Sequence, residues 1–136
     1  MLAILQSMLT STIEFVVNIG ILAAVGVVAY SGYTAGAKKQ AAKSNQAAVA
    51  KYVAAELQKC NLGETSAMGG ALVCSGNTGA KTVTASVTAL ADFKNPYSPT
   101  SAAVTSNATA ATDSALVGNT VVSQSASEVT ISTCIV

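Results

Sequence analysis

The first 36 residues are almost entirely apolar or small, and their one charged side chain is the carboxylate of Glu14. No lysine precedes Lys38, and the chain contains no arginine. Residues 15–35 form 21 consecutive positions without a charge, and about 20 apolar residues in a helix are enough to cross a lipid bilayer. Such a segment must be covered by lipid or by protein, so it predicts a membrane anchor or a buried helical core.

Residues 37–60 follow the pattern of an amphipathic helix. One side of this helix is apolar and consists of Ala42, Val49, Val53, Leu57 and Cys60. The other side is polar and consists of Gln40, Lys43, Ser44, Lys51 and Gln58. No proline occurs in residues 1–60, and Gly63 provides a stop signal. We therefore expect one helix from about residue 3 to residue 59, about 85 Å long at 1.5 Å per residue.

Residues 61–136 predict a small head domain with loops. Residues 81–93 fit a strand or a helix, and we favour a short helix because Leu90-Ala91 breaks the strand alternation. Residues 95–99 form a loop around Pro96 and Pro99. Residues 115–122 and 128–136 predict a C-terminal β-hairpin, with a third strand expected near residues 71–74. The expected fold class is α+β, a long N-terminal helix packed against a small antiparallel β-sheet head.

This organisation has three parts. Residues 1–36 are the apolar half of the helix, the membrane anchor or filament core. Residues 37–60 are the amphipathic half of the same helix, and residues 61–136 are the globular head. The head is too small to cover the whole helix, so about half of the helix must be buried by lipid or by other copies of the chain.

The three cysteines, Cys60, Cys74 and Cys134, show no metal-binding spacing. A Cys60–Cys74 disulfide would fasten the following loop to the helix end, whereas a Cys74–Cys134 disulfide would fasten the final strand, and the sequence leaves both pairings open. One structural disulfide and one buried thiol are expected, which indicates an oxidising compartment.

Three lysines, Lys38, Lys39 and Lys43, directly follow the apolar run. The positive-inside rule places such lysines in the cytoplasm, in conflict with the compartment that the cysteines indicate. Insertion by dedicated machinery reconciles the two signals.

Composition argues against an enzyme. The chain has no histidine, which removes the commonest general base and the commonest transition-metal ligand. The net charge is +1 and the lysines are spread along the chain, so nothing indicates a nucleic-acid site. We expect no catalytic residues, no cofactor and no metal.

Small residues recur between positions 20 and 36, and they allow helix backbones to approach closely. We assign Gly20, Ala23, Gly26 and Ala29 to assembly between copies, together with Glu14. A lone carboxylate in an apolar bundle costs several kcal/mol unless it is paired. The nearest lysine in the sequence, Lys38, lies about 36 Å further along the helix.

The run Gly20-Ile21-Leu22-Ala23-Ala24, with a glutamate before it and Ala37-Lys38-Lys39 after an aromatic-containing stretch, closely resembles the N-terminal helix of type IV pilins. The match covers about the first 60 residues and is most specific over residues 13–39. Asn95-Pro96-Tyr97 is similar to loops in many pilin heads.

The resemblance implies a prepilin that is inserted in the bacterial inner membrane and then cleaved and N-methylated by prepilin peptidase. The pilus assembly machinery then packs it, helix against helix, into an extracellular filament, or fimbrium. The partner of Glu14 is then the α-amino group of a neighbouring copy.

Two features differ from the pilin pattern. Pilins carry the glutamate nine residues before the glycine of this run, whereas Glu14 is six residues before Gly20. Alignment on Gly20 starts the mature chain at Ser7 and puts Ser11 fifth, and alignment on Glu14 starts it at Thr10. A mature start at Met1 is a third option, and it puts Leu5 where the acid is expected. The common helix-interrupting proline is also missing, and Val28 lies near its place. The cleavage site stays open.

Three functions compete. The first is a pilus subunit that serves adhesion, twitching or uptake. The second is a pseudopilin of a type II-like secretion system, whose heads often bind calcium through clustered acids, whereas Asp92, Asp113 and Glu128 are scattered here. The third is a single-span membrane protein with a small binding head, which would not need the small residues or Glu14. Asn107 matches the glycosylation pattern, but such triplets also arise by chance.

Overall fold

The computed structural model describes the backbone of residues 2–106, 116–126 and 128–135, with the side chains of Gln6 and of the residues from Thr12 onward in these ranges. The chain divides into two compact units, Met1–Gly36 and Ala37–Val136. A long helix, α1 (Leu2–Asn61), runs through both units without a break, as expected. The fold is α+β, and the candidate glycosylation residue Asn107 lies outside the described residues.

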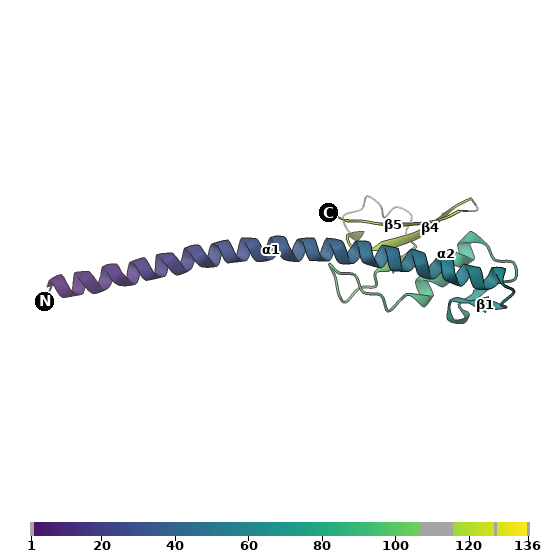
Figure 1. Cartoon of the computed structure of the whole chain (residues 1–136), viewed down its shortest axis with the longest axis horizontal. Helices are drawn as coiled ribbons and strands as arrows, with labels where there is room; N and C mark the ends of the chain where they lie inside the picture. The colour runs from purple at the N-terminus through teal and green to yellow at the C-terminus, as the bar shows by residue number, and fades with distance from the viewer. Residues whose placement is uncertain (1, 107–115, 127, 136) are drawn as a thin grey trace. The chain divides into compact units, whose positions relative to one another are not determined.

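The second unit contains all the shorter elements (Figure 1). In chain order they are β1 (Ser66–Ala67), the 3-10 helix η1 (Met68–Gly70), β2 (Leu72–Val73), α2 (Gly79–Ala89), β3 (Val104–Thr105), β4 (Thr120–Ser125) and β5 (Glu128–Thr133).

Within the second unit, α1 contributes one side to the hydrophobic core. Ala42, Val49 and Val53 are buried, and Leu57 and Cys60 are half-buried, so the predicted apolar stripe is confirmed. The predicted polar side is exposed at Gln40, Lys43, Ser44, Lys51 and Gln58. The stripe forms because apolar residues at this spacing share one helix face and exclude water together.

Helix α2 covers part of the same core. Thr78 caps its N-terminus by accepting a hydrogen bond from the backbone N–H of Lys81, and Val83 and Ala85 are buried beneath it. The short helix expected over residues 81–93 is therefore confirmed, although it begins and ends earlier in the chain. A Cβ atom at Gly79 would lie 3.3 Å from the Cβ of Gln124 on β4 and would displace the end of that side chain, so glycine eases the close approach of helix and sheet.

The C-terminal hairpin is also confirmed. Strands β4 and β5 pair antiparallel, with Val122 opposite Ile131 and Gln124 opposite Val129. Val122 is fully buried, and Val129 and Ile131 pack against the core from the face that they share. This face is apolar because alternate residues of a strand point the same way.

The third strand of this sheet is not the one expected. Residues 71–74 were expected to lie beside the hairpin, but β2 pairs antiparallel with β1 in a separate two-stranded sheet. Instead β3 joins the hairpin through a parallel pairing with β4, so the three-stranded sheet is mixed. The tight turn of η1 brings β1 and β2 together locally, so β2 pairs with β1. The free edge of β4 then pairs with β3 instead.

The expected loop at residues 95–99 is held by the buried side chain of Asn95. Its amide nitrogen donates to the carbonyl of Val117, and its amide oxygen accepts the backbone N–H of Tyr97. The amide of Asn45 on α1 donates to the carbonyl of Lys94 at the start of this loop. These bonds fix the loop against the second-unit part of α1.

The disulfide joins Cys60 to Cys74, which was one of the two expected pairings. The alternative, Cys74 with Cys134, is wrong, and the direction of β5 explains why. Val129 near the start of β5 lines a cavity with Leu57, whereas the carbonyl of Ile131 accepts a hydrogen bond from Gln46, three turns earlier on α1. Cys134 lies beyond Ile131, so β5 carries it away from the helix end that bears Cys60.

We expect Cys60→Ser with Cys74→Ser to lower the free energy of unfolding by about 3 kcal/mol, the chain-entropy value for a loop of this size. Thermal unfolding of the full chain in detergent, with and without reductant, measures the loss. The matched control is Cys134→Ala, which should leave the reductant effect intact. Non-reduced peptide mapping that recovers Cys60 and Cys74 as thiols would contradict this pairing.

Candidate functional site

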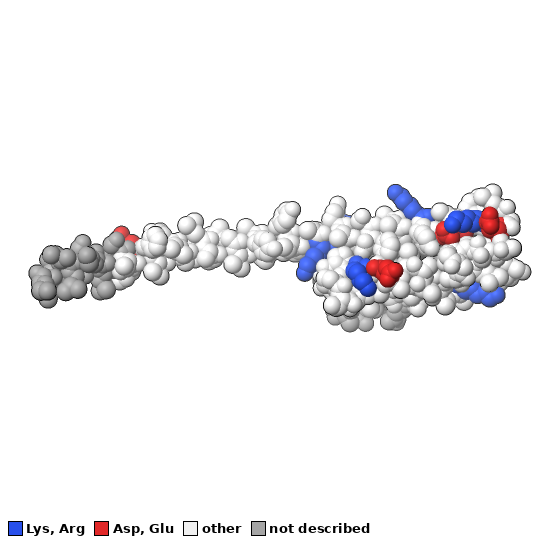
Figure 2. Space-filling model, turned by 90° about the horizontal axis from the view of Figure 1, so that it is seen from below, with Lys and Arg blue, Asp and Glu red and all other residues white. Residues whose placement is uncertain are grey.

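The apolar part of α1 in the first unit, residues 12–36, is exposed along its length. Its twelve large hydrophobic side chains are each between 51% and 76% exposed. They are Ile13, Phe15, Val16, Val17, Ile19, Ile21, Leu22, Val25, Val27, Val28, Tyr30 and Tyr33. Among the described residues, this is the one helix long and apolar enough to cross a membrane. In Figure 2 the charged side chains are concentrated on the second unit.

This exposed surface is large in energetic terms. Burying one such side chain contributes about 1.5–3 kcal/mol, so twelve of them represent roughly 20 kcal/mol or more. The net stability of a folded domain is about 5–15 kcal/mol. A contiguous apolar surface of this size marks a site that is covered by lipid or by another protein.

The glycines of this segment are not required by the packing of the chain itself. A Cβ atom at Gly20, Gly26 or Gly32 would meet nothing within 4 Å. These three residues are spaced six apart, and residues six apart on an α-helix point about 120° away from each other. They therefore leave room for close approach on three sides of α1, an arrangement suited to a helix with several neighbours rather than one.

Two polar side chains in the segment are already satisfied within the helix. Ser31 donates its hydroxyl to the carbonyl of Val28, and Thr34 donates to the carbonyl of Ser31. A buried hydroxyl is costly when it lacks a hydrogen bond. Because these two have one, they do not oppose burial of this part of α1.

Glu14 lies on the same exposed helix. The ion pair among the described residues is Lys59–Glu56, so no described cation lies within 4 Å of Glu14. Lys38 is about 36 Å along the helix, several times the screening length of about 8–10 Å at physiological salt. The counter-charge that Glu14 needs when buried must come from outside the described residues of its own chain.

The proposed assembly residues Gly20, Ala23, Gly26 and Ala29 all lie on this part of α1, as Glu14 does. Ala24, Val25, Val28 and Ala29 line a shallow apolar depression on the helix surface. The single chain brings these residues together only as successive turns of one helix, so contacts between copies are the test of their role.

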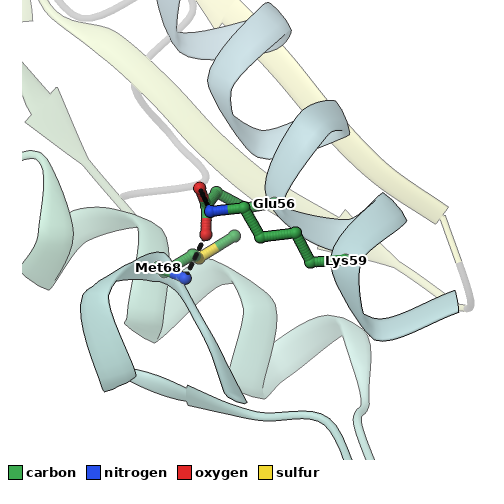
Figure 3. Close-up of polar contacts among 3 residues, drawn as sticks. All are labelled: Glu56, Lys59 and Met68. Atoms are coloured by element: carbon green, nitrogen blue, oxygen red, sulfur yellow. Dashed lines mark hydrogen bonds and ion pairs between the residues drawn. The ribbon is translucent and has the colours of Figure 1, made fainter. Parts of the chain in front are cut away.

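A second polar feature lies inside the second unit, and the sequence interpretation missed it. Glu56 is on the core side of α1 and is 7% exposed (Figure 3). Its carboxylate accepts hydrogen bonds from the ammonium group of Lys59 and from the backbone N–H of Met68. The signal was available, because Glu56 follows Val53 by three residues on the apolar stripe.

The carboxylate of Glu56 holds a backbone turn that is otherwise unfavourable. Met68, Gly69 and Gly70 all have positive φ angles, of 54°, 65° and 93°. A positive φ is rare for a residue with a side chain, such as Met68. The hydrogen bond from Met68 to Glu56 therefore fastens η1, and with it the β1–β2 sheet, to α1.

The hydrogen bonds from Lys59 and then from Met68 hold the pKa of the Glu56 carboxyl below its ordinary value of 4.5, while burial opposes them. The same pairing raises the pKa of Lys59. Among the described residues, no group of three or more cysteine or acidic side chains is placed to hold a metal ion.

Comparison with known proteins does not assign this chain to a family. The chain matches no protein-family model, no curated protein and no solved structure. What the structure establishes is coarser, namely a long apolar N-terminal helix, a small sheet and a disulfide, which are compatible with a pilin-like fold.

We expect Glu56→Gln to lower the unfolding temperature and to reduce its pH dependence. Because the folded-state pKa is lowered, the carboxylate stabilises the fold above pH 4.5 and this stabilisation is lost as pH falls through the folded-state pKa. The difference between wild type and variant should therefore narrow between pH 6 and about pH 3.

Thermal unfolding of the full chain in detergent, followed across that pH range, measures this effect. Glu64→Gln is the matched control, because Glu64 is an exposed carboxylate eight residues from Glu56. A gap between wild type and Glu56→Gln that stays constant with pH would show that the charge of Glu56 is not what stabilises the turn.

Proposed function

We propose that this protein is the structural subunit of an extracellular, type IV pilus-like filament. In the filament, residues 12–36 of α1 pack against the same segment of other copies, so the main partner is the chain itself. The observation that carries the proposal is the exposed apolar length of α1, with twelve large hydrophobic side chains that are each more than half exposed. The glycines that leave room on three sides and the satisfied hydroxyls support burial among several helices.

The resemblance to pilins suggests how the subunit travels from the membrane to the filament. The subunit begins as a precursor in the bacterial inner membrane, where lipid covers the apolar helix, and prepilin peptidase and the assembly machinery then transfer it to the filament. The Cys60–Cys74 disulfide supports an oxidising compartment for the second unit, since such bonds persist mainly outside the cytosol. The role is structural, without catalysis or cofactor.

One alternative has an observation of its own. A helix that can cross a membrane also fits a single-span protein with a small binding head. In that case the three glycines that face different sides of α1 have no role between copies, and neither does Glu14. A pseudopilin is the nearer alternative, because it uses the same helix packing in a periplasmic filament.

Electron microscopy of filaments sheared from cells, with mass spectrometry of their subunit, tests the proposal. Surface filaments built from this chain are the expected result. A chain found only in the membrane fraction, with no filaments that depend on its gene, would favour the single-span protein. Filaments confined to the periplasm would favour the pseudopilin.

We expect Glu14→Gln to leave membrane insertion intact and to lower filament yield. The variant keeps the shape of the side chain and removes the charge that pairs with the α-amino group of the next copy. A buried pair that loses one partner costs about 3–5 kcal/mol, so yield should fall by at least tenfold. Quantitative immunoblotting of the sheared filament and membrane fractions measures both effects.

Glu14→Asp is the matched control for charge, and it should retain more filament than Glu14→Gln. Wild-type yield from Glu14→Gln would mean that this carboxylate does not determine assembly.

We expect Gly26→Leu and Ala29→Leu to block close helix approach and to reduce filament yield. Extra methylene groups in a packed interface cost about 1–3 kcal/mol per contact, and every subunit in the filament repeats that contact. Val27→Leu is the matched control, because it enlarges a side chain where the helix already carries a bulky one. Normal yield from both Gly26→Leu and Ala29→Leu would rule out small-residue packing at these positions.

A further inference from the structure

The lysines that follow the apolar segment form a cationic face on α1. Lys39 and Lys43 are four residues apart and therefore lie on one side of the helix, with Lys38 beside them. Like charges at this spacing destabilise a helix unless a counter-charge is near. Lys38 and Lys43 are exposed and Lys39 is half-buried.

Among the described residues, no carboxylate lies within 4 Å of these three ammonium groups, because the ion pair there is Lys59–Glu56. Along α1 the nearest acidic residues are Glu14 and Glu56, which are 24 residues before Lys38 and 13 residues after Lys43. Lys38 lies over the ring of Tyr97, with 5.9 Å from the nitrogen to the ring centroid. The face therefore has positive charge and no paired anion in the described part of the chain.

The position of the lysines along α1 matches the polar layer of a bilayer. Residues 15–35 span about 30 Å as a helix, which is the thickness of the hydrocarbon core. Lys38 and Lys39 follow within about 6 Å, and Lys43 follows at about 12 Å. Because the Cα–Cβ bond of a helical residue tilts toward the N-terminus, a long lysine side chain at position 43 is able to extend toward the apolar segment.

Two tyrosines also lie where the helix would meet the polar layer of a bilayer. Tyr30 and Tyr33 are 72% and 76% exposed, and they occupy the last turns of the apolar segment. Tyrosine is enriched at the level of the lipid headgroups, because its ring is apolar and its hydroxyl is polar. At the opposite end of residues 15–35, Glu14 also falls at the boundary of the hydrocarbon core.

We infer that Lys38, Lys39 and Lys43 bind the headgroups of anionic phospholipids while the subunit is in the membrane, before it enters the filament. The inference rests on the membrane stage of the proposed function, and it adds the lipid chemistry and the residues that recognise it. The anionic phosphate supplies the counter-charge that the described residues do not. When a subunit leaves the bilayer for the filament, these lysines must exchange lipid phosphate for another anion or for water.

The test uses the full chain reconstituted in vesicles, with tyrosine fluorescence as the probe. Brominated lipids quench a fluorophore that they touch, so quenching by brominated phosphatidylglycerol and by brominated phosphatidylcholine gives the relative binding of the anionic and neutral lipid. We expect the anionic lipid to be preferred by about fivefold for each engaged lysine, and the preference to fall at 0.5 M salt.

The decisive variant is Lys39→Gln with Lys43→Gln, which should lower the preference about 25-fold or abolish it. The matched control is Lys51→Gln with Lys81→Gln, which removes the same charge. Lys51 is about 24 Å beyond residue 35 along the helix, and Lys81 lies on α2, outside α1. The control should retain the wild-type preference.

Equal quenching of the wild type by both lipids would overturn the inference and leave the filament proposal standing, with carboxylates of a neighbouring copy as the remaining counter-charge. Equal loss of preference in both double variants would also overturn it, because net charge rather than this face would then select the lipid. No quenching by either lipid would contradict the membrane stage of the proposed function as well.

Discussion

Exposed apolar surface on one helix is the constraint on which the rest of this molecule depends. In the second unit, α1 buries Val49 and Val53 beneath its own chain. In the first unit the same helix is at least as apolar, yet its described large hydrophobic side chains are exposed. One side of α1 is therefore covered within the second unit, whereas its described part in the first unit presents an apolar surface of the kind that lipid or another protein covers. Covering these side chains contributes roughly 20 kcal/mol of gross burial free energy, from which the entropy cost of association must be subtracted.

The features that the sequence predicted well are those set by one element at a time. The apolar stripe with Val49 and Val53 follows from helical periodicity alone, and the hairpin face with Val129 and Ile131 follows from strand alternation. The exposed apolar surface of α1 is visible for the same reason, because the composition along a single helix predicts it. Assignment of Gly26 to contacts between copies is a further step that a single chain leaves as a prediction.

The features that the sequence missed depend on how separate segments meet. Strand β3 has two residues, too few for any periodic pattern, and its partner β4 is distant in the chain. The choice between two disulfides depends on the direction in which β5 carries Cys134 along α1, which spacing does not reveal. Glu56 was missed because a single carboxylate on an apolar stripe has no evident role in the sequence. Its role becomes clear only with its partner, the backbone N–H of Met68.

The Cys60–Cys74 bond has a mechanical consequence. It joins residues 14 positions apart, directly at the end of α1. When the chain is pulled from its two ends, the segment between these cysteines bears no load and cannot extend, which removes about 45 Å of contour length at the usual reach per residue. Tension that reaches the end of α1 then passes through the Cys60–Cys74 bond into the chain that follows Cys74, and onward to α2. The turn that Glu56 secures is thus shielded from stretching, and lengthening under force is restricted to α1 and to the part of the chain after Cys74.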